Sequence, residues 1–204
     1  GPRKNLNNTI KWFVEEFKDD EVGLVIKANK AKNNVVDRSH CVQELKSILS
    51  EYPDRKCKVY LLHGNMTDEE MHALYKNPKI KAIVSTSHGE GFGLPLFEAA
   101  YSALPVIAPE WSGHCDFLFA PVKDKKGKEK VKALFSKINY TLQNVQKEAV
   151  WDGVIQEDSM WCYPEEKSYK IALRELYKDP GRFKKQAKIL QKWVLKTFSE
   201  DLQY

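Results

Sequence analysis

The stretch that most constrains the fold is residues 85–100, which read Ser-Thr-Ser-His-Gly-Glu-Gly-Phe-Gly-Leu-Pro-Leu-Phe-Glu-Ala-Ala. It follows the apolar, β-rich run 82–84 and leads into an apolar helical pattern, so it predicts a strand, a glycine-rich turn and a helix. Pro95 suits the first helical position, because the N–H that it lacks would be unpaired there. The free amides at the start of this helix would point at a phosphate group. The stretch therefore predicts an anion site at the end of a strand.

Three glycines and two glutamates set the chemistry of this turn. Gly89, Gly91 and Gly93 allow a tight backbone and the close approach of a ligand. Glu90 lies within the turn, and Glu98 lies in the first turn of the helix. Because a carboxylate repels a neighbouring phosphate, we expect both glutamates to accept hydrogen bonds from sugar or ribose hydroxyls. The alternative is an ordinary strand-to-helix turn with solvated glutamates.

The form EGFGLPLFEA resembles the E-x7-E signature of the retaining, group 1 nucleotide-sugar glycosyltransferases of the GT-B fold. The dinucleotide fingerprint GxGxxG is absent. The resemblance implies that Glu98 binds ribose hydroxyls, that Glu90 orients the sugar, and that the turn amides receive the diphosphate. The donor-binding residues that it implies around the turn are Gly89, Gly91, Phe92, Gly93, Leu94 and Glu98.

The fold class that we predict is α/β, with a Rossmann-like doubly wound parallel sheet covered by helices on both faces. Short apolar strands alternate with amphipathic helices along the chain, which favours a parallel sheet. The resemblance makes this sheet the C-terminal, donor-binding domain of a GT-B enzyme. In that family a first strand precedes the basic loop, so we expect this strand to be missing and the chain to be a fragment.

Arg3 and Lys4 precede an amphipathic helix whose apolar residues run from Leu6 to Phe17. On the residues alone, a solvated basic chain end is the favoured interpretation. The family resemblance reverses this preference, since group 1 enzymes place a basic pair in the first βα loop of the donor domain. It implies that Arg3 and Lys4 neutralise the departing diphosphate, so they join Glu90 as the predicted catalytic residues.

Two further loops follow predicted strands, where ligands bind in open α/β sheets. Gly64, Asn65 and Met66 come after the strand 58–63 and precede a capping box; the resemblance places them beside the nucleotide base. Without it they are an ordinary helix entrance. Ser112, Gly113 and His114 follow the strand 104–109 and resemble a variant of the family's glycine loop. Whether His114 contacts phosphate or only packs is left open.

The composition suits one soluble domain: the chain has 204 residues, 42% of them hydrophobic and 30% charged. We predict a single nucleotide-sugar-binding domain over 1–204, with 165–204 as its C-terminal helical extension. A formal charge of +5 is modest and dispersed, which argues against a nucleic-acid partner. No signal segment or apolar membrane span is visible, so we expect a cytoplasmic protein, at most peripheral to a membrane.

The four cysteines are widely scattered, and neither a CxxC pair nor an Asp-x-Asp motif occurs. We therefore expect reduced thiols, no metal and no cofactor besides the donor substrate. Asp37 is expected to cap the helix that ends before Pro53. The lysine-rich segment 123–132 predicts a solvated loop, with a lipid contact as the weaker alternative.

Taken with the resemblance, the sequence predicts a donor-binding domain that transfers a sugar from a nucleoside-diphosphate sugar to an acceptor with retention. The expected partners are the donor itself and an acceptor-binding N-terminal domain. Two alternatives stay open: a nucleotide- or sugar-binding module that is inactive as this fragment, and another GT-B enzyme such as an epimerase or phosphorylase. The base, the sugar and the acceptor are not determined by the sequence.

Overall fold

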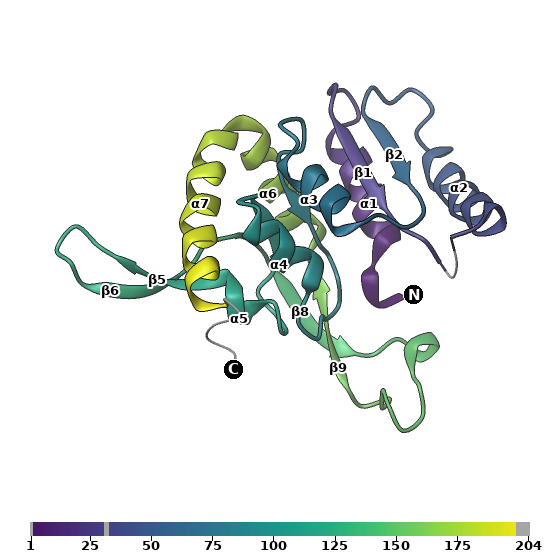
Figure 1. The fold of residues 1–204 in the computed structure, drawn as a ribbon. Helices are drawn as coiled ribbons and strands as arrows, with labels where there is room; N and C mark the ends of the chain where they lie inside the picture. Colours follow the sequence, from purple (N-terminus) through teal and green to yellow (C-terminus); the bar gives the residue numbers. More distant parts are fainter. Residues whose placement is uncertain (1, 31–32, 199–204) are drawn as a thin grey trace.

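The computed structural model describes residues 2–30 and 33–198, which form a mixed α/β fold (Figure 1). Its α-helices are α1 (Leu6–Glu16), α2 (Val35–Leu49), α3 (Asp68–Lys76), α4 (Leu94–Tyr101), α5 (Cys115–Leu118), α6 (Glu166–Lys178) and α7 (Pro180–Thr197). Its strands are β1 (Gly23–Lys27), β2 (Lys58–Leu62), β3 (Ile83–Val84), β4 (Val106–Pro109), β5 (Phe119–Lys123), β6 (Glu129–Ala133), β7 (Ser136–Ile138), β8 (Tyr140–Asn144) and β9 (Met160–Pro164). Two short 3-10 helices, η1 (Pro2–Lys4) and η2 (Lys147–Ala149), complete it.

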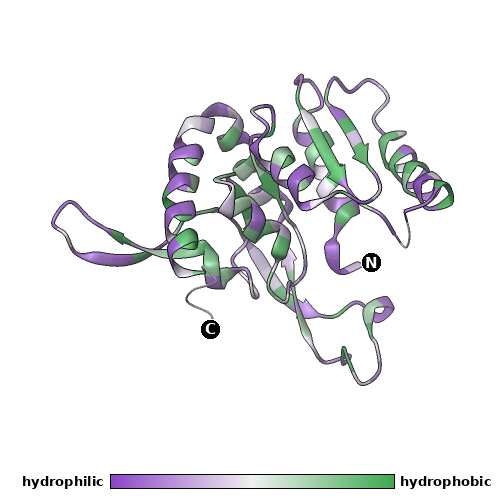
Figure 2. Ribbon diagram, in the orientation of Figure 1, coloured by the Kyte–Doolittle hydropathy of each residue, from purple (hydrophilic) through white to green (hydrophobic). Residues whose placement is uncertain are grey.

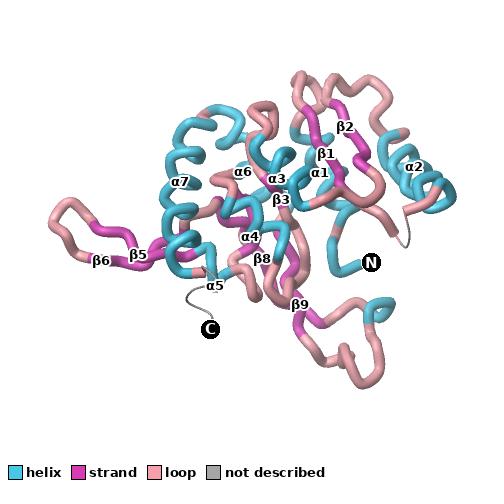
Figure 3. The backbone as a smooth tube through the Cα atoms, in the orientation of Figure 1, coloured by secondary structure: helices cyan, strands magenta, loops and turns pink. Residues whose placement is uncertain are grey.

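The sheets confirm the α/β prediction and add two antiparallel hairpins. β1 pairs with β2 in parallel, and β3, β4 and β7 form a second parallel sheet in the order β3-β4-β7. β5 pairs antiparallel with β6, and β8 pairs antiparallel with β9. The parallel pairs form the predicted α/β layer, while the hairpins extend beyond it (Figure 3).

Strand β4 lies between two apolar layers, which explains why its sequence is apolar throughout. All four of its residues are buried. Val106 and Ala108 belong to one core cluster, which includes residues of α4 and α7, whereas Ile107 belongs to the other, which includes residues of α1 and α6. Successive side chains of a strand point to opposite faces, so a strand with both faces covered has no polar side.

Helix boundaries follow the local capping chemistry, with two corrections. The predicted capping box is confirmed, because Thr67 accepts from the Glu70 amide and the Glu70 carboxylate accepts from the Thr67 amide. Helix α2 is capped by Asn34, whose side chain accepts a hydrogen bond from the Asp37 amide, so the prediction that Asp37 itself caps is wrong. Helix α4 begins at Leu94, which puts Pro95 at its second position rather than its first.

The lysine-rich segment is a hairpin rather than a loop, which corrects the sequence-based prediction. Strands β5 and β6 turn at Gly127, whose φ of 77° requires a glycine-like conformation. The hairpin projects from the body of the molecule (Figure 1), and its far half is hydrophilic (Figure 2). The outer part of the hairpin is exposed on both faces, so its lysine-rich sequence has no apolar period that would predict a strand.

The last two helices pack into the same two core clusters as the sheet. The fully buried Tyr169 of α6 donates its hydroxyl to the carbonyl oxygen of Thr9 in α1 at 2.9 Å. Helix α7 lies beside α4 (Figure 1). Its residues Leu190 and Val194 belong to the same core cluster as the buried residues of α4. Residues 199–204 of the predicted extension 165–204 lie outside the described residues. Within the described ranges, no helix is both long and apolar enough to cross a membrane.

Candidate functional site

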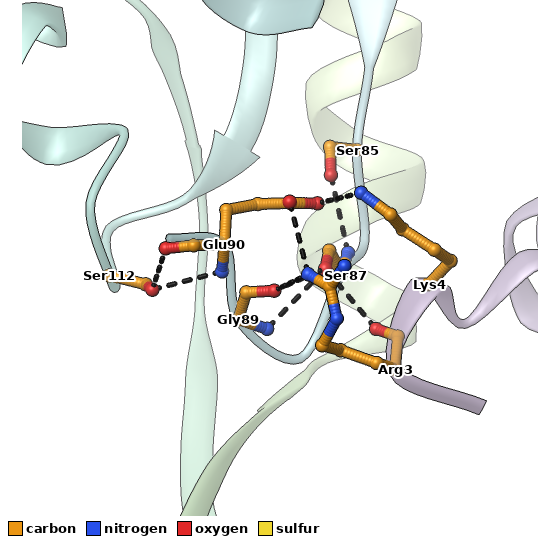
Figure 4. Close-up of polar contacts among 7 residues, drawn as sticks. All are labelled: Arg3, Lys4, Ser85, Ser87, Gly89, Glu90 and Ser112. Carbon is orange, nitrogen blue, oxygen red and sulfur yellow. Dashed lines mark hydrogen bonds and ion pairs between the residues drawn. The ribbon is translucent and has the colours of Figure 1, made fainter. Parts of the chain in front are cut away.

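Arg3, Lys4 and Glu90 form an ion-pair cluster at the glycine-rich turn (Figure 4). Lys4 Nζ lies 2.6 Å from one carboxylate oxygen of Glu90, and Arg3 Nη1 lies 3.1 Å from the other. Arg3 also donates to the carbonyl oxygen of Gly89. The Glu90 side chain is only 10% exposed, whereas those of Arg3 and Lys4 are 42% and 49% exposed. The three predicted catalytic residues are thus in contact, and two cations face the solvent.

Hydrogen bonds hold residues 3–5 against residues 86–88, which lead into the turn. The amide of His88 donates to the carbonyl oxygen of Arg3 at 2.8 Å, and the Asn5 side chain donates to the Thr86 carbonyl at 3.2 Å. Ser87 Oγ lies 3.2 Å from the same Arg3 oxygen. Residues 3–5 are therefore fixed by the strand end rather than being a free basic terminus.

His88 anchors the turn to the hairpin β8–β9. Its ring is 2% exposed and stacks on Trp161, with 5.4 Å between centroids and 8° between planes. Nδ1 lies 2.6 Å from the carbonyl oxygen of Cys162, which can only accept, so Nδ1 carries the proton. Burial lowers the pKa of His88 in spite of this hydrogen bond, so its ring is neutral at pH 7. His88 is a structural residue whose role sequence reasoning missed, since its partner is 74 residues away.

The loop after β4 packs directly on the turn through Ser112 and Gly113. Ser112 Oγ accepts from the Glu90 amide at 2.9 Å and donates to the Glu90 carbonyl at 2.5 Å. The Gly113 amide also donates to that carbonyl, at 3.0 Å. A Cβ atom on Gly113 would lie 1.7 Å from the carbonyl oxygen of Gly91, so only glycine fits there.

His114 packs beneath the turn. His114 is 1% exposed. A Cβ atom placed on Gly93 would lie only 3.1 Å from the Cβ of His114. Nε2 lies 2.7 Å from the carbonyl oxygen of Pro109 and donates to it, which leaves Nδ1 with no partner among the described residues. Burial lowers the pKa of His114, so its ring is neutral at pH 7. The sequence left two interpretations open for His114, contact with phosphate or packing. Its buried position and its hydrogen bond to Pro109 agree with packing.

Glu98 is held by a residue of another helix. Tyr75 of α3 donates its hydroxyl to Glu98 Oε2 at 3.1 Å. Tyr75 is 6% exposed, and burial together with the Glu98 charge raises its pKa above the usual range. The Tyr75 hydroxyl therefore stays protonated and can fix one oxygen of Glu98, while the other oxygen has no such bond among the described residues.

The start of α4 offers free amides, as predicted for an anion site. Among the described residues, the N–H groups of 91–94 find no acceptor. Gly93 adopts a φ of 86°, which ends the turn and starts the helix. The Phe92 side chain packs against Phe97 and Phe117 in the core, so only its backbone faces the turn. Leu94 is 62% exposed.

The third predicted loop lies at the end of the other parallel pair. Gly64 follows β2 with a φ of 102°, and its carbonyl oxygen accepts a hydrogen bond from Lys27 at the end of β1. Asn65 is exposed and Met66 is half-buried. No recorded contact of the described residues joins this loop to the glycine-rich turn, so the pairing of these two regions in one site stays a prediction.

The Glu90 cluster predicts a stability that depends on pH in the acid range. Burial works to raise the pKa of Glu90, but hydrogen bonds from Lys4 and Arg3 outweigh it and hold the pKa below its ordinary value of 4.5. A carboxyl with a lowered folded-state pKa contributes stability above its unfolded pKa, and this contribution is lost as the pH falls through the folded pKa. We expect the Tm difference between wild type and Glu90→Gln to be largest near neutral pH and to shrink below about pH 4.

Thermal denaturation by circular dichroism at a series of pH values measures this effect. Glu110→Gln is the control, because Glu110 pairs with Lys137 on the surface with 42% of its side chain exposed. A Glu90→Gln difference that does not change with pH would mean that the carboxylate charge does not stabilise the folded chain.

The chain matches known glycosyltransferases in sequence. A family model described as glycosyl transferases group 1 matches residues 56–152, which include the turn, Glu98 and the loops at 64–66 and 112–114. Two serotype-specific mannosyltransferases WbdA of Escherichia coli are 35% and 42% identical to it over 107 residues. Each match covers 52% of this chain but only 12% of the relative. The chain therefore corresponds to a small part of these relatives.

Solved structures agree in fold. Sucrose-phosphate synthase from Thermosynechococcus elongatus superposes with a TM-score of 0.59 at 15% identity, over 98% of this chain and 40% of that chain. TarM superposes with a TM-score of 0.57 at 17% identity, over 100% of this chain and 32% of that chain. Residues 56–152 are therefore similar to the group 1 glycosyltransferases, and the superpositions show that the chain has the fold of the GT-B enzymes.

Proposed function

We propose that this chain is the donor-binding part of a glycosyltransferase that takes a sugar from a nucleoside-diphosphate sugar and transfers it with retention. The observation that supports this most is the pairing of Arg3 and Lys4 with Glu90 beside the free amides of 91–94. Two cations and a helix N-terminus converge on one turn, which is the arrangement that a diphosphate needs. The match to group 1 glycosyltransferases supports the same substrate class.

In this proposal the ion pairs exchange when the donor binds. The half-exposed Arg3 and Lys4 turn from Glu90 to the diphosphate, whose two charges they balance together with the turn amides. Glu90 then has free carboxylate oxygens, which accept hydrogen bonds from sugar hydroxyls. As the glycosidic C–O bond breaks, negative charge grows on the departing phosphate, and preorganised cations stabilise it. Glu98, oriented by Tyr75, accepts from the ribose hydroxyls.

The proposal includes two further points that follow from the family. Arg3, Lys4 and the amides supply the positive charge, so transfer is expected to need no metal. The acceptor is expected to bind to an N-terminal domain that faces the turn across a cleft. If that domain is required, this chain alone binds the donor without turning it over.

A comparison of ligands on Lys4→Ala tests the proposal. We expect removal of the Lys4 ammonium to weaken nucleoside-diphosphate binding about five- to tenfold; the loss is moderate because solvent screens a half-exposed charge. Nucleoside binding is expected to stay unchanged, because a nucleoside has no phosphate. Calorimetric titration with a panel of nucleoside diphosphates and the matching nucleosides measures both. Lys11→Ala is the control, since Lys11 is a similarly exposed lysine that pairs with Glu51 instead.

Three outcomes are informative. Equal losses for diphosphate and nucleoside would show that Lys4 does not contact phosphate. Failure of every nucleoside diphosphate to bind the wild-type chain would refute the proposed donor class. Binding without donor hydrolysis, converted to turnover by an added N-terminal domain, would support the division of labour between two domains.

A further inference from the structure

Asp37, Cys41 and His63 place three metal-binding side chains at one point of the structure. Asp37 and Cys41 are one turn apart on α2, so they share a face of that helix. His63 follows the last residue of β2. One donor atom from each side chain lies within 4.8 Å of the others, and His63 Nε2 lies 2.8 Å from Asp37 Oδ2.

All three side chains are shielded from solvent. Asp37 and Cys41 are each 6% exposed, and the His63 side chain is also 6% exposed. The amide of Lys30 donates to Asp37 Oδ2 at 3.1 Å, and the Asp37 amide is itself held by Asn34. These contacts position the carboxylate as the outer hydrogen bonds of a metal site do.

The donor set identifies the class of ion. A thiolate, an imidazole and a carboxylate are all zinc ligands, whereas calcium and magnesium prefer oxygen atoms alone. Tetrahedral zinc with bonds of about 2.0–2.3 Å keeps its ligand atoms roughly 3.3–3.7 Å apart. The Asp37–His63 contact therefore opens by less than about 1 Å on binding, while the Cys41 sulfur moves inward. Both changes are within the reach of side-chain rotation on a fixed backbone.

We propose that Asp37, Cys41 and His63 bind one zinc ion, which ties the first turns of α2 to the carboxyl end of β2. Binding releases the Cys41 thiol proton, and the proton that His63 Nε2 shares with Asp37 Oδ2 moves to Nδ1 of the ring, so that Nε2 and the carboxylate supply the other two ligands. The fourth position is left for water. Because His63 directly precedes Gly64, the ion fixes the start of the loop 64–66. None of the three ligands is itself a predicted donor residue, so metal binding can be tested whether or not the proposed function holds.

Cobalt(II) titration of the chelator-treated chain tests the site. Wild type is expected to bind one equivalent of Co²⁺ with a thiolate charge-transfer absorption, and Zn²⁺ is expected to displace it. Cys41→Ser is expected to abolish the thiolate absorption, and His63→Ala to weaken binding more than about tenfold. His40→Ala is the matched control, because His40 is exposed on the same helix and outside the cluster, and it is expected to bind as wild type does.

Absence of Co²⁺ and Zn²⁺ binding to wild type would overturn the proposal, as would thiolate absorption that persists in Cys41→Ser. A second measurement does not depend on any variant folding. Excess Zn²⁺ is expected to raise the Tm of the wild-type chain, because the ion binds the folded state. An unchanged Tm would contradict a site that ties α2 to β2.

Discussion

Gly113→Ala is expected to lower the melting temperature of this chain more than any other single-methyl change at the site. The added Cβ would lie 1.7 Å from the carbonyl oxygen of Gly91 and 3.1 Å from that of Glu90. Both neighbours are backbone, so neither rotates away, and the loop 111–114 must separate from the turn. We expect a loss of about 3 kcal/mol or more, which for a chain of this size lowers Tm by roughly 6–12 °C.

Gly91→Ala is the matched control for this prediction. A Cβ on Gly91 meets nothing within 4 Å, and its φ is not in the left-handed region, so its Tm is expected to stay near that of wild type. Differential scanning calorimetry measures both variants. Equal Tm values for Gly113→Ala and Gly91→Ala would contradict the close packing of the two loops.

The two variants also separate stability from ligand binding. If a diphosphate approaches the turn backbone, Gly91→Ala weakens nucleoside-diphosphate binding without unfolding the chain, because its methyl group occupies the open side. Retained affinity in Gly91→Ala would place the phosphate elsewhere along the helix start.

Features with a local cause could be predicted from the sequence. The capping box at Thr67, the apolar strand β4 and the strand–turn–helix around Glu90 each depend on residues within a few positions of one another. The same holds for the order of strands and helices that predicted a parallel α/β fold. The placement of Arg3 and Lys4 beside Glu90 came from the family resemblance, because 86 residues separate Lys4 from Glu90.

Features that depend on distant partners could not be predicted. Nothing near His88 in the sequence indicates that its ring would bind the Cys162 carbonyl. The bond from Tyr75 to Glu98 depends on the packing of α3 on α4, which no neighbouring residue in the sequence indicates. The cysteine spacing predicts no metal cluster. The only histidine or cysteine close to Cys41 in the sequence is His40, whose side chain is exposed. The proposed zinc ligands come from two elements, Asp37 and Cys41 from α2 and His63 from the end of β2, so the cysteine spacing carries no signal for them.

Glu98→Ala is expected to weaken nucleoside-diphosphate binding by about 1–3 kcal/mol, roughly 5- to 150-fold in Kd. The proposed role of Glu98 is to accept hydrogen bonds from the two ribose hydroxyls, and removing it leaves them without a protein partner. The loss should therefore vanish when the ligand is the 2′,3′-dideoxy analogue, which has no such hydroxyls. Calorimetric titration of both ligands on wild type and variant measures the difference.

Tyr75→Phe extends this test to the residue that orients Glu98. Removing the hydroxyl that donates to Glu98 Oε2 is expected to give a smaller loss of affinity, again only for the ribose-containing ligand. In the double variant with Glu98→Ala, Tyr75→Phe is expected to add nothing, because it acts through the carboxylate. Tyr101→Phe is the control, since Tyr101 is 47% exposed at the end of α4. Additive losses in the double variant, or an equal loss for the dideoxy ligand, would show that Tyr75 and Glu98 do not act together on the ribose.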